Sequence, residues 1–416
     1  MISIDTIVNI FGMELEYDFL SAWIKYTRLK EGVSQEYLAH GICSVSHLSY
    51  FENGKKHLRK EIIEALLKKL NISSLGRFQN IGLVRQKLNT MMNAIESFNR
   101  DEAQRIYKEL EKIEEVLKLS PYSIEFKIYE LMYKTFVESQ SYDILKYDIN
   151  LMDKIYMSLS KDLKFIYLFI SGSIFSKNHM NEEGIKRQKE ALKLKDTSWI
   201  NYCLGQSYCF STSPSTGVYY LEKALDSYEK SGRYLNAVWC HNYLGIGFSY
   251  LKLYDQAEKH FDAALMSAKH FDMDKLYSHL YTNLSNLYSC LGKYEESLKW
   301  SSLALKETKG GTLSAYNYVD ACLKLGKLKE CQEIFDEFLD MKDKDTLYTN
   351  PLYFLYLVAY KFNDDIFYEE VKNKILPYYE KTKVNDVCRD IKLKLIEYLE
   401  NRRRYKEANK LYKELL

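Results

Sequence analysis

The chain has 416 residues and a formal net charge of +2, so it is not a uniformly basic protein that coats nucleic acid. It contains only 4 Pro and 17 Gly, too few for the many turns of an all-β or doubly wound fold, while 46% of its residues are hydrophobic. These values predict an all-α protein of two or three domains with a sizeable core.

The start of the chain and its longest apolar stretches predict a cytoplasmic protein. Residues 1–18 carry Asp5, Glu14 and Glu16 without a basic start, so they do not resemble a secretory signal, and they form an extension whose role is open. The apolar stretches at 165–175 and 352–360 are much shorter than the roughly 20 residues that span a bilayer.

The cysteine and histidine residues give no sign of a metal or catalytic site. The 8 Cys include no CxxC pair and the 8 His are dispersed, so we expect neither a zinc site nor a disulfide framework. There is no HExxH sequence and no glycine-rich phosphate loop. We therefore expect no metal, no cofactor and no enzymatic activity.

A compact bundle of four or five short helices is predicted in the first part of the chain. Ser34 is placed to cap one helix, and Gly32, Gly41 and Gly54 are placed to end three of them. We assign residues 1–72 to this domain. The predicted helices cover residues 19–29, 35–40, 44–52 and 58–70.

From residue 73 to residue 416 the sequence predicts an array of about eight helical hairpins. Its clearest pattern recurs after 40 residues, from Ala257 to Ser297, and resembles the tetratricopeptide repeat. Small residues such as Gly245, Ala257 and Ala264 would let two antiparallel helices approach closely. Such arrays curl into a right-handed superhelix whose concave face suits peptides. Further hairpins are predicted at 80–118, 125–160 and 162–195.

The segment from Gly32 to Gly54 resembles the phage-repressor and xenobiotic-response-element family of helix-turn-helix domains. The resemblance is carried by Ser34-Gln35, Leu38-Ala39, Gly41-Ile42, Leu48-Ser49 and Glu52-Asn53-Gly54. It implies that the helix at 44–52 enters the major groove of double-stranded DNA. Residues 21–60 hold seven Lys or Arg and three acidic residues, a local charge of +4.

The resemblance assigns candidate DNA contacts by position. The outer face of the recognition helix offers Val45, Ser46, His47 and Tyr50 to base edges, with Ser44 at its start. Gln35 resembles the glutamine with which the family binds phosphate, and Asn53, Lys55 and Lys56 follow the helix and can contact the DNA backbone. Because this helix carries few basic side chains, we expect a homodimer or higher homo-oligomer. The alternative is a bundle used only for protein contacts.

The two halves together resemble the peptide-sensing regulators of Gram-positive bacteria. This group contains PlcR, NprR, Rgg, Rap and the phage arbitrium receptors, and the length and the sequence from Gly41 to Ser49 most resemble its NprR branch. The resemblance implies a quorum-sensing transcription regulator controlled by a short linear peptide in the concave groove. Amides recur there and can pair with a peptide backbone. The candidates are Asn201, Gln206, Asn242, Asn283, Asn286 and Asn317.

Other interpretations stay open at this point. An Asn on an exposed helix face is usually only solvated. The chain also fits a Rap-like protein that sequesters a response regulator, or a phage-type repressor whose repeats only oligomerise.

Overall fold

The computed structural model describes residues 17–72, 81–114, 117, 120, 122–211, 213–271, 273–308, 312–339, 351–381 and 385–415. These residues form helices and no strand, which confirms the predicted all-α class. The chain divides into two compact units, Met1–Leu251 and Lys252–Leu416. This division differs from the boundary predicted at 72/73, which stays a prediction. No helix in the described part of the chain is long and apolar enough to cross a membrane.

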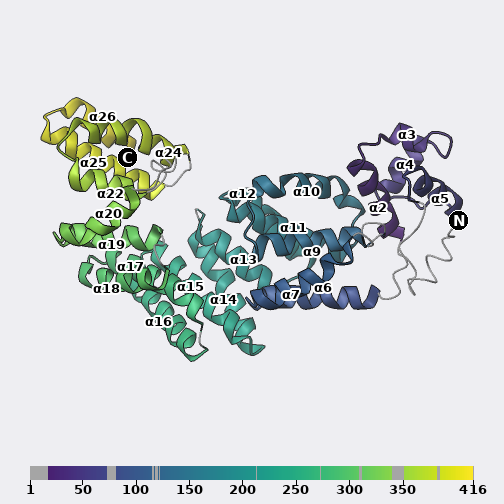
Figure 1. The fold of residues 1–416 in the computed structure, drawn as a ribbon, viewed down its shortest axis with the longest axis horizontal. Coiled ribbons are helices and arrows are strands. Elements are labelled where there is room, and N and C mark those ends of the chain that lie inside the picture. Colours follow the sequence, from purple (N-terminus) through teal and green to yellow (C-terminus); the bar gives the residue numbers. More distant parts are fainter. Residues whose placement is uncertain are drawn as a thin grey trace. The chain divides into compact units, whose positions relative to one another are not determined.

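The helix-turn-helix bundle lies at the start of the N-terminal unit (Figure 1). Ser34 caps α3 (Gln35–Ala39) and Ser44 caps α4 (Val45–Glu52), because their hydroxyls accept hydrogen bonds from the main-chain N–H of Tyr37 and His47. Trp23 and Leu48 are fully buried between the helices, and burial of each such side chain contributes about 1.5–3 kcal/mol. The bundle comprises α2 (Tyr17–Lys30), α3 (Gln35–Ala39), α4 (Val45–Glu52) and α5 (Lys60–Lys69). Four of the expected helices are therefore confirmed.

Antiparallel hairpins make up the rest of the N-terminal unit, as the repeat pattern predicted. They are α6 (Ile81–Glu96) with α7 (Arg100–Glu111), α9 (Ser123–Phe136) with α10 (Tyr142–Ile155), α11 (Lys161–Lys177) with α12 (Asn181–Leu194), and α13 (Ser198–Cys209) with α14 (Pro214–Lys230). A short 3₁₀ turn, Tyr156–Ser158, follows α10, and α15 (Tyr234–Tyr250) ends the unit. One continuous core joins the helix-turn-helix bundle to these hairpins.

Glycines set the spacing within two of these hairpins. A Cβ added at Gly217 of α14 would lie 2.7 Å from the main-chain nitrogen of Cys209, and one added at Gly184 of α12 would lie 2.8 Å from that of Ser176. Real Cβ atoms essentially never come this close to backbone atoms. The helices of these hairpins therefore pack with their backbones in near contact.

The C-terminal unit continues with hairpins and then departs from them. Its elements are α16 (Tyr254–His270), α17 (Asp274–Cys290), α18 (Tyr294–Thr308), α19 (Thr312–Lys324), α20 (Gln332–Leu339), α22 (Pro351–Tyr360), α23 (Asp365–Glu370), α24 (Leu376–Lys381), α25 (Asn385–Asn401) and α26 (Tyr405–Leu415). A 3₁₀ turn (Leu328–Cys331) precedes α20, and a π-helical turn (Val371–Ile375) joins α23 to α24. The uniform repeat predicted to residue 416 is thus interrupted by short helices.

Serines replace glycine at the seam between α17 and α18. Ser285 Oγ donates to the carbonyl oxygen of Ser297, and Ser297 Oγ donates to that of Ser285, both at 2.9 Å. Both residues are fully buried. Small side chains that bond each other's backbone therefore keep this seam narrow.

Candidate DNA interface and its connection to the repeats

The outer face of α4 is accessible along its length. Val45 and Tyr50 keep 37% and 53% of their surface exposed. Ser44, Ser46 and His47 are exposed on the same helix. The structure therefore brings together the five base-contact candidates of the recognition helix, while their role in DNA reading stays a prediction.

A buried ion pair holds α4 against α2 from behind. Glu52, the last residue of α4, is fully buried and accepts from Arg28, with Nε–Oε1 at 2.6 Å and a second guanidinium nitrogen to Oε2 at 2.7 Å. Arg28 also donates to the carbonyl oxygen of Val33 at 2.9 Å. A two-point contact between Arg and a carboxylate fixes angle as well as distance. It therefore sets how α4 projects from the bundle.

Gln35 takes part in this buried network. Its side-chain amide donates to Glu52 Oε2 at 2.7 Å, and the residue is half-buried. One of the two N–H donors of Gln35 therefore positions α4, and the phosphate contact expected of this residue stays a prediction. A contact with phosphate would use the remaining donor.

The side chain of Asn53 likewise forms hydrogen bonds within the bundle. Its Oδ1 accepts from Lys25 Nζ at 2.7 Å, and its Nδ2 donates to the carbonyl oxygen of Ser49 at 2.8 Å. Burial lowers the pKa of Lys25, although the Glu52 carboxylate opposes this shift. Asn53 therefore ends α4 and ties it to α2, and its expected contact with the DNA backbone stays a prediction.

The accessible positive charge lies in the loop after α4. Lys55 and Lys56 are exposed, and Lys56 Nζ lies 3.0 Å from Nε2 of His47. This contact places one of the predicted backbone-binding lysines directly beside the recognition face. Arg28 is buried and Lys25 is half-buried, so these two residues contribute little to the outer surface.

The end of the recognition helix touches the repeats. Ser158, in the 3₁₀ turn after α10, donates its hydroxyl to the main-chain carbonyl oxygen of Glu52, and both residues are buried. A Cβ at Gly54 would lie 3.8 Å from the Cα of Ser158, so the turn after α4 packs on the same segment.

A second contact lies along α2. Tyr26 of α2 is buried, and burial raises its pKa to about 12. The charges of Lys127 and Asp148 act on it, and these two form an ion pair at 2.7 Å between α9 and α10. The Phe19 ring lies 6.3 Å from that of Tyr122. The helix-turn-helix bundle and the first hairpins therefore share a packed junction.

The predicted peptide-binding amides of the N-terminal unit fall into two groups, two that are buried and one that is half-buried. Asn201 and Asn242 are each 2% exposed, and Asn201 donates to Asp196 Oδ1 at 2.6 Å and to the carbonyl oxygen of Thr197 at 2.9 Å. Gln206 is half-buried and donates to the hydroxyl of Tyr202 at 2.9 Å. Asn201 and Asn242 are thus buried in this structure, and peptide binding by them stays a prediction.

The C-terminal unit shows the same division. Asn317 is buried and donates to the carbonyl oxygen of Thr282 at 3.1 Å, so it bridges α17 and α19. Asn283 is half-buried and Asn286 is exposed. Gln206, Asn283 and Asn286 therefore remain the accessible candidates, and peptide binding by them stays a prediction.

Arg28, Glu52 and Ser158 hold α4 in place but were not among the predicted site residues. The Glu52-Asn53-Gly54 sequence was recognised only as part of the motif. Ser158 lies 106 residues from Glu52 in the chain, and no local sequence pattern links them.

Residues 24–76 match the helix-turn-helix family model. Over 399 residues the chain is 23% identical to the transcriptional activator NprA of Geobacillus stearothermophilus, a match that covers 90% of this chain and 97% of that protein. The domain predicted from the motif is thereby confirmed.

Solved structures share the fold. The apo form of the quorum sensor NprR from B. thuringiensis is 19% identical with a TM-score of 0.65, covering 79% of this chain and 97% of that one. A Rap protein complexed with competence and sporulation factor is 17% identical with a TM-score of 0.68, covering 80% and 97%. The expected resemblance to the NprR and Rap group is confirmed; at these identities the solved structures establish the fold alone.

Proposed function

We propose that this chain is a quorum-sensing type of transcription regulator that binds operator DNA through α4 and responds to a short linear peptide bound by its repeats. It acts in the cytoplasm as a homodimer, and it is a binding protein without a catalytic step. The similarity to a transcriptional activator along nearly the whole chain supports this proposal.

The observation that carries the proposal is the accessible face of α4 on a rigidly held helix. Ser46, His47 and Tyr50 are exposed, while the Arg28–Glu52 ion pair behind them is buried. A helix that presents polar and aromatic side chains in a fixed orientation suits the reading of base edges in a major groove. Lys55 and Lys56 add charge where phosphates would lie.

The proposed response to a peptide is supported by the fold, which this chain shares with a solved peptide complex. The solved structures with this fold include NprR in complex with its cognate peptide NprX, at 20% identity and a TM-score of 0.58. In this chain the accessible amides of Gln206, Asn283 and Asn286 offer both donors and acceptors. Such groups can bind an extended peptide backbone without regard to its side chains.

A DNA-selection experiment tests the proposed DNA binding by α4. The full chain selects duplexes from a random library, and affinity for the selected site is compared with affinity for a scrambled one. Replacing Ser46, His47 and Tyr50 together by Ala removes this discrimination, because each good base contact is worth roughly 1–3 kcal/mol. Tyr405→Ala, which alters a tyrosine exposed on α26, keeps it. Equal discrimination by the triple variant and the parent contradicts the assignment of α4.

The lysines give an independent readout of the same interface. Lys55→Ala with Lys56→Ala weakens binding to the selected and scrambled sites alike. It also lowers the slope of log affinity against log salt by about 0.9 for each phosphate that the protein no longer neutralises. An unchanged salt slope means that the loop after α4 does not contact the DNA backbone.

Calorimetry tests the proposed binding of a linear peptide. A panel of linear peptides of five to eight residues is first screened by thermal stability, since a ligand at 100 times its dissociation constant adds about 2.7 kcal/mol. Gln206→Ala and Asn286→Ala each weaken binding of the best peptide, by roughly 1–3 kcal/mol for each buried hydrogen-bonding partner that is removed. Asn409→Ala, on an exposed asparagine of α26, leaves it unchanged. Full affinity in both variants places the peptide elsewhere.

A further inference from the structure

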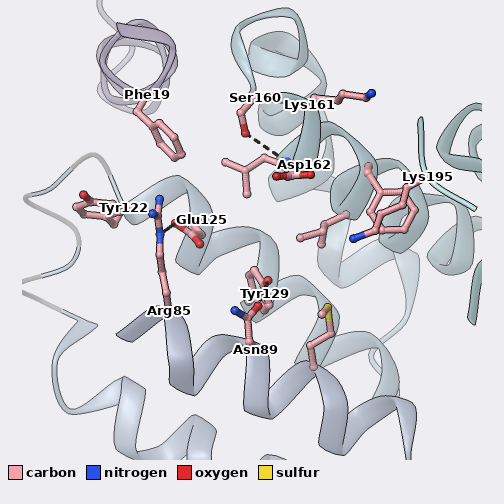
Figure 2. A pocket seen from close by; sticks show the side chains of 14 residues that line it. Phe19, Arg85, Asn89, Tyr122, Glu125, Tyr129, Ser160, Lys161, Asp162 and Lys195 are labelled. Atoms are coloured by element: carbon pink, nitrogen blue, oxygen red, sulfur yellow. Dashed lines mark hydrogen bonds and ion pairs between the residues drawn. The ribbon is translucent and has the colours of Figure 1, made fainter. Parts of the chain in front are cut away.

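A pocket of about 520 Å³ lies where the helix-turn-helix bundle meets the first repeat hairpins, within the N-terminal unit (Figure 2). Phe19 of α2 lines it together with side chains from α6, α9, the start of α11 and the segment after α12. Its volume lies within the roughly 300–1,000 Å³ of typical small-molecule sites. It involves none of the amides considered above as peptide contacts.

One wall of the pocket is fixed by internal contacts. Arg85 Nε lies 3.1 Å from Glu125 Oε2, and the guanidinium carbon lies 5.6 Å and 5.2 Å from the ring centroids of Phe19 and Tyr122. Burial raises the pKa of Glu125, which the charge of Arg85 opposes. The charges of this wall therefore balance each other, and its rings form a preformed apolar surface.

The opposite wall carries one acid, Asp162, and two lysines, Lys161 and Lys195, and all three are exposed. Among the described residues, Asp162 in the first turn of α11 and Lys195 after α12 form no ion pair. Figure 2 shows both on the side of the pocket formed by α11, across from Arg85 and Glu125. Lys195 Nζ lies 5.8 Å from the ring centroid of Phe165.

Apolar side chains also line the pocket. Met92, Phe165 and Ile166 line the pocket and are half-buried, so each keeps apolar surface that a ligand can cover. A ligand that matches this wall needs a cation for Asp162, an anion for Lys195 and an apolar group.

We infer that this pocket binds a small zwitterion with an apolar side chain, either a free amino acid or a short peptide, whose ammonium group faces Asp162 and whose carboxylate faces Lys195. Phe19 belongs to α2, which packs in the helix-turn-helix core, whereas Asp162 and Lys195 belong to the repeats. The bound ligand therefore stabilises the junction between the two by mass action.

Calorimetry on the full chain tests this inference with three probes: L-phenylalanine, the dipeptide Leu-Phe, and N-acetyl-phenylalanine amide, which lacks both charges. We expect at least one charged probe to bind and the capped probe not to bind. Binding of phenylalanine alone identifies a free amino acid as the ligand type, and binding of Leu-Phe alone identifies a peptide. No binding of either charged probe, or equal binding of the capped one, overturns the inference.

Charge-removing variants locate the binding in this pocket. Lys195→Met and Asp162→Asn each weaken binding of the charged probe about tenfold, equivalent to about 1.4 kcal/mol. The matched controls are Lys193→Met, on an exposed lysine of α12, and Asp101→Asn, on an exposed aspartate in the first turn of α7; both keep the parent affinity. Parent affinity in both pocket variants overturns the inference.

Hydrogen exchange measures whether ligand binding stabilises the junction between the helix-turn-helix bundle and the repeats. Saturating probe slows hydrogen exchange in α2 of the parent chain and leaves it unchanged in Lys195→Met. The response to linear peptides in the Gln206 and Asn286 variants is measured separately, so this inference and the proposed function can fail independently.

Discussion

The carboxylate of Glu52, the last residue of α4, accepts three side-chain hydrogen bonds. It is fully buried and accepts from Arg28 and Gln35. A buried pair costs much desolvation, so its net contribution to stability is small, but the loss of one partner leaves the other buried and uncompensated. The Arg28–Glu52 ion pair instead fixes the orientation of α4, because it sets the angle between α2 and α4.

We predict that Glu52→Gln destabilises the protein by about 3–5 kcal/mol, because Arg28 then stays buried without its counter-charge. The double variant Arg28→Met with Glu52→Met recovers most of this loss. Urea unfolding measures both. Asp226→Asn, which breaks the exposed 2.7 Å pair with Lys230, serves as the control and changes stability by less than about 1 kcal/mol. A small effect of Glu52→Gln contradicts this view of the pair.

His241 on α15 gives a prediction for pH. Burial lowers its pKa below the ordinary value of 6.5. Below pH 6.5 the unfolded chain therefore binds a proton more readily than the folded chain does, and stability falls as the pH drops toward the lower, folded pKa. His241→Tyr, which installs the residue found 40 positions later at Tyr281, removes this component.

Urea midpoints at about pH 7.5 and about pH 5.5 measure the effect, since these values lie on either side of the ordinary histidine pKa. The control His179→Asn changes an exposed histidine with a φ of 62°, a conformation that Asn tolerates. It keeps the parent's pH dependence. An identical pH dependence in His241→Tyr and the parent rules out His241 as its source.

At the scale of elements, hairpins with backbones in near contact depend on positions without a side chain. Gly205 and Gly217 face each other between α13 and α14, where a Cβ at Gly217 would meet the Cys209 backbone. In α17 and α18 the corresponding seam is closed by Ser285 and Ser297, which bond to each other's carbonyl groups. The same spacing is thus reached with two kinds of small residue.

We predict that Gly217→Ala destabilises the protein by about 1–3 kcal/mol through overpacking. Gly82→Ala is the matched control, since Gly82 lies in α6 with nothing within 4 Å of the added Cβ, and it raises stability by about 0.5–1 kcal/mol. Thermal unfolding shows whether each variant gains or loses stability. If both variants gain stability, the α13–α14 seam is wider than described.

The helices were predictable because their patterns are local. Apolar spacing, serine caps and glycine stops define α3 and α4, and the small residues of the repeat define the hairpins. Exposure of Val45, Ser46, His47 and Tyr50 followed from the helical period. The amides were less predictable, because one helical period does not tell which face meets a neighbour: Asn201 and Asn317 turned out to be buried. Ser158 and the pocket depend on long-range packing that no local pattern encodes.

At the scale of the whole molecule, the junction gives the repeats a direct contact with α4 in the N-terminal unit. Ser158 bonds the carbonyl group that ends α4, and Tyr26 of α2 packs beside the Lys127–Asp148 pair. A shift of α10 relative to α9 would therefore act on α2 and on the end of α4 together.

We predict that Ser158→Ala speeds hydrogen exchange in α4, because the buried carbonyl of Glu52 then has no hydrogen-bond donor, at a cost of about 1–3 kcal/mol. The effect of a bound peptide on DNA affinity decreases in the same variant. Ser141→Ala removes an exposed serine at the start of α10 that makes no capping hydrogen bond, and it leaves both readouts unchanged. Parent-like exchange in Ser158→Ala would show that this contact does not hold α4.

Because Ser158 bonds a main-chain oxygen, the attachment on the bundle side does not depend on which side chain occupies position 52 or on the outer face of α4. The recognition surface can therefore diverge while the attachment persists. For protein engineering, this makes α4 replaceable: a helix with another outer sequence can be grafted in, provided that it ends at the same turn and keeps an acid for Arg28.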